Sequence, residues 1–134
     1  APPPVDLDIE RRNGDFVRAS IAQERLTACH DVSDGGLAIA LAEMAIAGNQ
    51  GAKIDHKPEI SLHAWAFGED QARYVVTTKD PDELASAAAD AQVPLTRLGR
   101  VGGTTLTLPG AKPISMERLR EAHTRWLPEY MSSC

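Results

Sequence analysis

Aromatic side chains, cysteines and long apolar runs are all scarce in this sequence. Only 4% of the 134 residues are Phe, Trp or Tyr. The two cysteines, Cys29 and Cys134, form neither a disulfide framework nor a metal-ligand pair. The longest apolar run, Leu37–Ala42, is far below the roughly 20 residues needed to cross a bilayer. The N-terminus also lacks the basic and apolar regions of a signal peptide. We therefore expect a reduced, soluble, cytoplasmic protein with no membrane partner.

An excess of basic residues is also missing. The formal net charge is -5, and no basic run with interleaved aromatics occurs. Protein surfaces that bind nucleic acids use Lys and Arg to neutralise phosphates, so we expect no nucleic-acid partner. The apolar fraction of 43% and the charged fraction of 25% are ordinary for a globular protein. A chain of this length is expected to form one domain with one core, without needing a disulfide or a metal.

The pattern of apolar residues predicts an α+β fold, with a largely antiparallel sheet packed with helices in the order α-β-α-β-β-α-β-β-α. Asp6 or Asp8 can cap the first helix. The Gly102-Gly103 pair predicts a two-residue hairpin turn. The expected helices are 8–24, 37–47, 81–91 and 115–126, the last ending before Pro128, with one short helix possible at 61–66. The expected strands are 26–30, 52–55, 72–78, 95–101 and 104–108.

Two helices have distinctive apolar patterns. In the first, Ile9, Phe16, Val17 and Ile21 fall on one stripe and predict the buried face. The helix at 37–47 is apolar on nearly every side, so it should be central and covered.

The stretch from His30 to Leu37 joins a predicted strand to this central helix. Its two glycines allow close backbone approach, and the helix start presents free N–H groups, so the stretch could cradle an anion. Alternatively, Ser33 or Asp34 is an N-cap and the glycines form a tight turn. Two aspartates beside a phosphate would also repel it unless a metal or an arginine intervened. The candidate residues are His30, Asp31, Ser33, Asp34, Gly35 and Gly36.

A second polar stretch, Gly68–Gln71, precedes the strongest predicted strand. Glu69 and Asp70 could be paired carboxylates for Mg²⁺ or for general acid–base chemistry. However, adjacent residues that enter a strand point to opposite faces. A polar turn that feeds the strand is therefore the alternative.

The residues alone supply no complete catalytic set. The four histidines, at 30, 56, 63 and 123, lack the spacing of a zinc site, and Cys29 projects to the opposite strand face from His30. The serines at 20, 33 and 61 lack the glycine pattern of a nucleophile elbow. We predict no catalytic residue and no metal ligand in this chain.

Four stretches resemble one enzyme family in order and spacing. The longest, Ala28–Ala45, closely resembles the signature of the last domain of the phosphoribosylformylglycinamidine synthases, which act in purine biosynthesis. Pro2–Leu7, Phe67–Tyr74 and the tail from Arg120 to Pro128 agree with it. The resemblance covers essentially the whole chain. It implies a domain of the type found at the C-terminal side of aminoimidazole ribonucleotide synthetase.

The resemblance implies a role within a larger enzyme. Residues 1–7 would be a linker from missing upstream domains, and residues 8–134 the domain itself. The whole enzyme is a ligase that uses ATP and Mg²⁺ to convert formylglycinamide ribonucleotide and glutamine-derived ammonia to the amidine. A glutaminase subunit and a small accessory subunit supply the ammonia. The family's catalytic residues lie in the other domains, so this chain is expected to be inactive alone and to need no cofactor of its own.

By position, the resemblance implies that the two polar stretches line a second cleft of the enzyme. These cleft-lining residues are His30, Asp31, Ser33, Asp34, Gly35, Gly36, Glu69, Asp70 and Gln71. Two alternatives stay open at this point. One is the same domain from a related ATP-using enzyme of the selenophosphate or thiamine-phosphate type, and the other is a stand-alone module that binds a small ligand.

Overall fold

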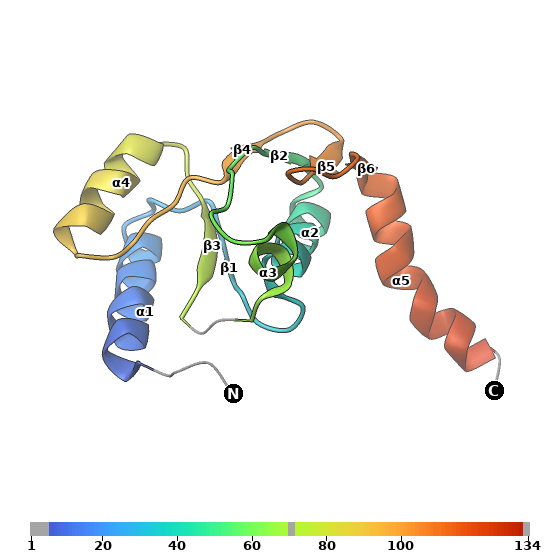
Figure 1. Ribbon diagram of the computed structural model, residues 1–134, viewed down its shortest axis with the longest axis horizontal. Helices are drawn as coiled ribbons and strands as arrows, with labels where there is room; N and C mark the ends of the chain where they lie inside the picture. Colours follow the sequence, from blue (N-terminus) through green and yellow to red (C-terminus); the bar gives the residue numbers. More distant parts are fainter. Residues whose placement is uncertain (1–5, 70–71, 133–134) are drawn as a thin grey trace. The chain divides into compact units, whose positions relative to one another are not determined.

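The fold is described from a computed structural model, which covers residues 6–69 and 72–132, with only the backbone course at 126 and 127 (Figure 1). It is α+β, as predicted, and combines mostly antiparallel strand pairs with one parallel pair. In chain order, the elements are α1 (Leu7–Ala22), β1 (Ala28–Asp31), α2 (Gly36–Gly48), β2 (Ala52–Ile54), α3 (Leu62–Phe67), β3 (Tyr74–Thr77), α4 (Pro81–Asp90), β4 (Gly99–Val101), β5 (Thr105–Thr107), β6 (Ile114–Ser115) and α5 (Met116–Ser132).

The contacts of the chain group into two compact units, whereas its length predicted a single core. Unit 1 comprises Ala1–Ala40 and Ile60–Arg97, and unit 2 comprises Leu41–Glu59 and Leu98–Cys134. Helix α2 begins in unit 1 and continues into unit 2. Both units are therefore built from segments that lie far apart in the sequence.

Unit 1 is organised around a two-stranded antiparallel ribbon of β1 and β3. Ala28 lies opposite Thr77 at one end, and Asp31 lies opposite Tyr74 at the other. Helix α1 is tied to the β3 side, because the Asn13 side-chain amide donates to the Ala72 carbonyl at 3.1 Å. The two ends of the ribbon thus have different neighbours.

Helix α1 starts as predicted, because Asp6 caps it and accepts the N–H groups of Asp8 and Ile9 at 3.1 Å each. The predicted apolar stripe is only partly right. Ile9 and Ile21 are 40% and 53% exposed, whereas Ser20 is buried. Near the C-terminal end of α1, the buried position is therefore one residue away from the predicted stripe, at Ser20 rather than at Ile21.

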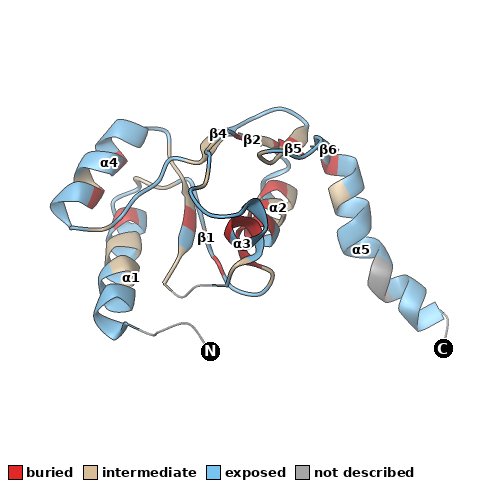
Figure 2. Cartoon of the chain, in the orientation of Figure 1, coloured by how far each residue is buried: buried red, intermediate tan, exposed pale blue. Residues whose placement is uncertain are grey.

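Helix α2 is covered along most of its length, as its all-round apolar sequence predicted (Figure 2). Its buried residues are Gly36, Leu37, Ala38, Ala40, Leu41 and Ala45. Ile39 is 41% exposed, and Ala47 and Gly48 at the end of the helix are exposed as well. Two other helices predicted near 61–66 and 81–91 are confirmed, and the structure shows their caps. Asp80 accepts the Glu83 N–H at 2.9 Å before α4, and Ser61 accepts the Ala64 N–H at 3.3 Å before α3.

Unit 2 contains a four-stranded sheet in the order β4-β2-β5-β6. The predicted hairpin across Gly102-Gly103 is wrong, because β4 and β5 each pair with β2, antiparallel and parallel respectively. The Gly51 backbone occupies the turn, donating to the Gly103 carbonyl at 2.9 Å and accepting the Gly102 N–H at 2.8 Å. A Cβ on Gly51 would lie 2.2 Å from the Thr105 carbonyl oxygen, so only glycine fits there.

The last helix also differs from its prediction. Its start is confirmed, since the Ser115 hydroxyl accepts the Arg118 N–H at 3.2 Å. The helix continues through Pro128 to Ser132, whereas the proline was expected to follow its end. The short strand β6, directly before it, was not predicted, because two residues carry too little periodicity to detect.

Candidate functional site

The two polar stretches singled out in the sequence meet in unit 1. The Gly35 N–H donates to Glu69 Oε1 at 2.8 Å, a contact between residues 34 positions apart. Glu69 follows α3, and Gly35 directly precedes α2. The structure therefore brings the 30–36 loop and the start of the 68–71 stretch together. Asp70 and Gln71 lie outside the described residues.

The two glycines of this loop are required by the backbone. Both have left-handed conformations, with φ of +84° at Gly35 and +70° at Gly36. A Cβ on Gly36 would lie 2.7 Å from the Phe67 carbonyl carbon and 2.8 Å from its Cα. The close approach that the glycines permit is thus to the end of α3, within the chain itself.

Backbone–backbone hydrogen bonds hold the rest of the loop in place. The Gly36 N–H donates to the Ser33 carbonyl at 3.0 Å, which closes the turn before α2. The N–H of Val32, which is buried, donates to the Arg73 carbonyl at 2.9 Å and ties the loop to the entry of β3. The side chains of Asp31, Ser33 and Asp34 are left exposed. The loop is consequently a fixed frame that presents polar side chains to its surroundings.

His30 is half-buried on β1, opposite Val75. Its Nδ1 lies 2.6 Å from the Asp31 carbonyl oxygen and 3.6 Å from Asp31 Oδ1. The short contact to the carbonyl oxygen orients the ring toward its neighbour on the strand.

Cys29 is a free, exposed thiol on β1, two residues before Asp31. Partial burial, and secondly the negative charge of Asp31, raise the pKa of this thiol above its ordinary value. The protonated form therefore dominates at neutral pH. Since the thiolate is the reactive form of cysteine, Cys29 is poorly suited to act as a nucleophile or a metal ligand.

Within residues 6–69 and 72–132, no group of three His, Cys, Asp or Glu side chains is placed to hold a metal ion. Among the helices of the described residues, none combines the length and the apolar content that crossing a membrane requires. Of the two carboxylates that were interpreted as a possible pair, Glu69 is the one within the described residues. Its carboxylate accepts a hydrogen bond from the Gly35 N–H.

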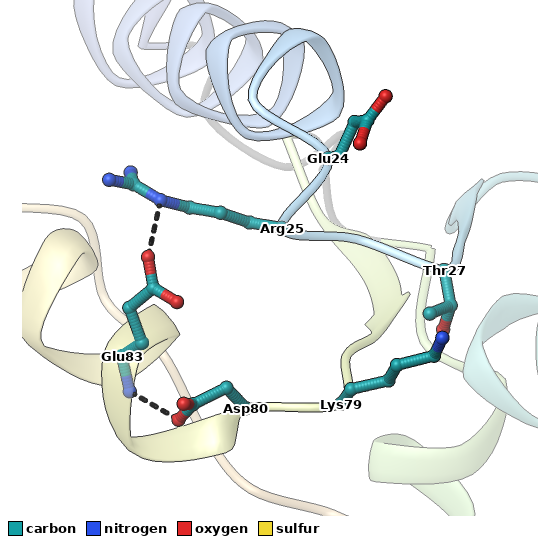
Figure 3. Close-up of a pocket in the computed structure, with 6 residues that line it drawn as sticks. All are labelled: Glu24, Arg25, Thr27, Lys79, Asp80 and Glu83. Carbon is teal, nitrogen blue, oxygen red and sulfur yellow. Dashed lines mark hydrogen bonds and ion pairs between the residues drawn. The ribbon is translucent and has the colours of Figure 1, made fainter.

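A pocket of about 220 Å³ lies at the opposite end of the β1–β3 ribbon (Figure 3). The residues that line it are Glu24, Arg25, Thr27, Lys79, Asp80 and Glu83. Arg25 Nε donates to Glu83 Oε1 at 3.1 Å, while Asp80 caps α4. Much of its charge is thus paired within the pocket itself, in a way that braces the end of α1 against the start of α4.

Sequence reasoning missed this pocket. Its two halves, residues 24–27 and 79–83, are brought together only by the pairing of β1 with β3. The local signal near it was the predicted start of a helix at Pro81, which carries no information about the opposite wall, residues 24–27.

Comparison with known proteins defines the class of this chain. A family model described as AIR synthase related protein, C-terminal domain, matches residues 1–108. The chain belongs to this family, which confirms the resemblance drawn from its sequence. Among its relatives are two proteins named phosphoribosylformylglycinamidine synthase subunit PurL. The one from Parvibaculum lavamentivorans is 56% identical over 99% of this chain, and the one from Rhodopseudomonas palustris is 54% identical over 98%.

Solved structures of PurL from Thermotoga maritima share the fold at 16% identity. Phosphoribosylformylglycinamidine synthase II matches 87% of this chain and 22% of its own with a TM-score of 0.73. The complex with ATP matches 81% and 21% with a TM-score of 0.66, and the PurLQS structure matches 82% and 21% with a TM-score of 0.68. The chain spans only 18% of the length of its curated relatives.

Proposed function

We propose that this chain is a non-catalytic domain of a phosphoribosylformylglycinamidine synthase. In that enzyme, ATP drives the conversion of formylglycinamide ribonucleotide and glutamine-derived ammonia to formylglycinamidine ribonucleotide. The observation that carries the proposal is the 56% identity to a synthase subunit over 99% of this chain. Identity at this level across a whole domain favours the synthase over other ATP-using enzymes that carry the same type of domain.

The role proposed for this domain is to form one wall of a second cleft. The residues proposed to line it are His30, Asp31, Ser33, Asp34, Gly35, Gly36, Glu69, Asp70 and Gln71. The exposed side chains of Asp31 and Asp34, held on a loop with a fixed backbone, support this role. No residue here is proposed to touch the reacting atoms, so the chain contributes shape and polar contacts rather than chemistry.

The other requirements belong to the whole enzyme. ATP and Mg²⁺ are proposed to bind mainly through its remaining domains. A solved relative in complex with ATP supports the use of this nucleotide. The proposed partners are those missing domains, a glutaminase subunit and a small accessory subunit. The PurLQS structure supports the existence of such an assembly. We place the enzyme in the cytoplasm.

The proposal is tested by comparing the isolated chain with the full-length polypeptide. With ATP, formylglycinamide ribonucleotide and ammonia, the full-length polypeptide should form the amidine, and the isolated chain should neither form it nor hydrolyse ATP. Turnover by the isolated chain would contradict its non-catalytic role. Absence of amidine formation by the full-length polypeptide with its partner subunits would contradict the assigned activity.

The cleft is tested separately by measuring ADP binding to the full-length polypeptide calorimetrically. Asp34→Ala should weaken binding by about tenfold, the effect of losing roughly one charge-assisted hydrogen bond from a hydroxyl or amino group of the nucleotide. Asp90→Ala, an exposed aspartate at the end of α4, is the matched control and should leave binding unchanged. Equal ADP binding by both variants would remove Asp34 from the cleft.

A further inference from the structure

We propose that Glu69 is a positioning residue, which closes the start of α2 from a separate segment of the chain. An anionic ligand of the cleft would then not be held by the Gly35 amide. The inference deepens the proposed function, because it assigns a role to one of the residues proposed to line the cleft. It rests on three contacts within unit 1.

The first contact is the hydrogen bond from the Gly35 N–H to Glu69 Oε1 at 2.8 Å. The first N–H groups at a helix start lack partners within the helix, and the helix dipole makes this end partly positive. A carboxylate can accept a hydrogen bond from such an N–H group and is attracted by the positive helix end, as a bound phosphate would be. Glu69 therefore occupies the position that the sequence assigned to a ligand anion.

The second contact fixes the main chain that carries Glu69. Gly68 ends α3 with its N–H on the Ala64 carbonyl at 2.9 Å, and its own carbonyl accepts from Arg73 Nη1 at 3.4 Å. Glu69 comes directly after this anchored residue. Its side chain therefore reaches Gly35 from a backbone that is already held in place.

The third contact lies beside the hydrogen bond. Gly36 packs so closely on Phe67 that a Cβ there would meet the Phe67 backbone at 2.7 Å. This backbone contact places α3 and the start of α2 against each other, two residues away from Glu69. Glu69 thus closes a junction whose two sides already touch, and its carboxylate would have to leave Gly35 before it could bind a cation.

The test is hydrogen exchange measured by mass spectrometry on the full-length polypeptide. Glu69→Ala removes the acceptor, so amides in a peptide covering residues 31–37 should exchange about five- to tenfold faster. Glu69→Gln keeps a carbonyl acceptor and should retain most of the protection. Glu59→Ala, an exposed glutamate in unit 2, is the control and should match the wild type. The peptide covering β3 monitors the stability of the unit itself.

Two results would overturn the proposal. One is unchanged exchange at residues 31–37 in Glu69→Ala. The other is slower exchange at the Gly35 amide itself, resolved by fragmenting the 31–37 peptide in the gas phase, when 10 mM inorganic phosphate or ADP is added to the wild type, since that would place an anion on this amide. Faster exchange in β3 of Glu69→Ala would mean that the variant destabilises unit 1 as a whole. The Glu69→Gln variant then decides, because faster exchange at residues 31–37 in that variant as well would contradict the acceptor role. None of these measurements depends on synthase activity, so they stand apart from the tests of the proposed function.

Discussion

The two ends of the β1–β3 ribbon are held together in different ways. At the Asp31 end, the loop before α2 is fixed by left-handed glycines and by backbone contacts. A Cβ added to Gly36 would lie 2.7 Å and 2.8 Å from two Phe67 backbone atoms. At the Ala28 end, the pocket is braced by side chains, chiefly the Arg25–Glu83 ion pair and the Asp80 cap. Backbone contacts leave no room for substitution, whereas side chains at a surface can be exchanged at small cost. The two ends should therefore respond very differently to mutation.

The largest effect is expected from Gly36→Ala, at the backbone-built end. Alanine would have to adopt φ of +70° and place its Cβ 2.7 Å from the Phe67 carbonyl carbon. We expect the free energy of unfolding to fall by about 3 kcal/mol or more in urea denaturation. Gly48→Ala is the matched control, since a Cβ at Gly48 meets nothing within 4 Å, and it should change stability by less than about 1 kcal/mol. Similar effects for both variants would contradict the tight contact.

Asp80→Ala should have an intermediate effect, at the side-chain end. It removes the acceptor for the Glu83 N–H at 2.9 Å and should cost about 1 kcal/mol of unfolding free energy. Asp82→Ala, in the same first turn, removes a charge but no cap and should cost only about 0.3 kcal/mol. Thermal unfolding of both variants measures the difference. A larger loss in Asp82→Ala than in Asp80→Ala would show that charge, rather than the cap, holds this end of α4.

A smaller effect is expected from the ion pair between Arg25 and Glu83. The side chains are 32% and 56% exposed, so solvent screens their attraction. A double-mutant cycle with Arg25→Met and Glu83→Gln should give a coupling energy of about 0.5 kcal/mol. In 1 M NaCl the Debye length falls to about 3 Å, and most of the coupling should disappear. A coupling energy that is unchanged in high salt would contradict the screening of this hydrogen-bonded ion pair by solvent.

The smallest effect concerns Cys29, on the ribbon between the two ends. Burial first, and then Asp31, raise its pKa, so the thiolate fraction at neutral pH is reduced. Asp31→Asn should lower the pKa and speed alkylation by iodoacetamide at pH 7.5 by about threefold or less, measured in a Cys134→Ser background. In both proteins the rate should rise with pH until it passes the thiol pKa. Ser33→Ala is the control, and slower alkylation in Asp31→Asn would contradict the assigned cause.

Local signals in the sequence were enough to place much of the fold. The caps at Asp6, Ser61, Asp80 and Ser115 each act on an N–H within three residues, so the sequence displays both partners close together. The all-round apolar pattern of α2 identified the central helix for the same reason. For the site, the residue pattern singled out the loop before α2 and the stretch containing Glu69, which the structure brings together through one hydrogen bond.

What escaped prediction depends on residues far apart in the sequence. The glycine pair at 102–103 has the local chemistry of a hairpin. However, the backbone of Gly51, about 50 positions earlier, forms hydrogen bonds with both glycines, and the hairpin does not form. The contact between Glu69 and Gly35 spans 34 positions, and no local pattern indicates that the carboxylate would occupy the helix start itself. Pairing over such distances is decided by the packing of whole elements, which a single sequence does not display.

The position of β2 in the middle of its sheet has a consequence for folding during synthesis. Both of its partners, β4 and β5, lie about 45–55 residues later in the chain, whereas β1 finds its partner once Thr77 has been made. Since a strand pairs only after its partner has left the ribosome, unit 1 can complete its ribbon while β2 is still unpaired. The second unit must therefore close last, because its central strand has to wait for a partner on each side.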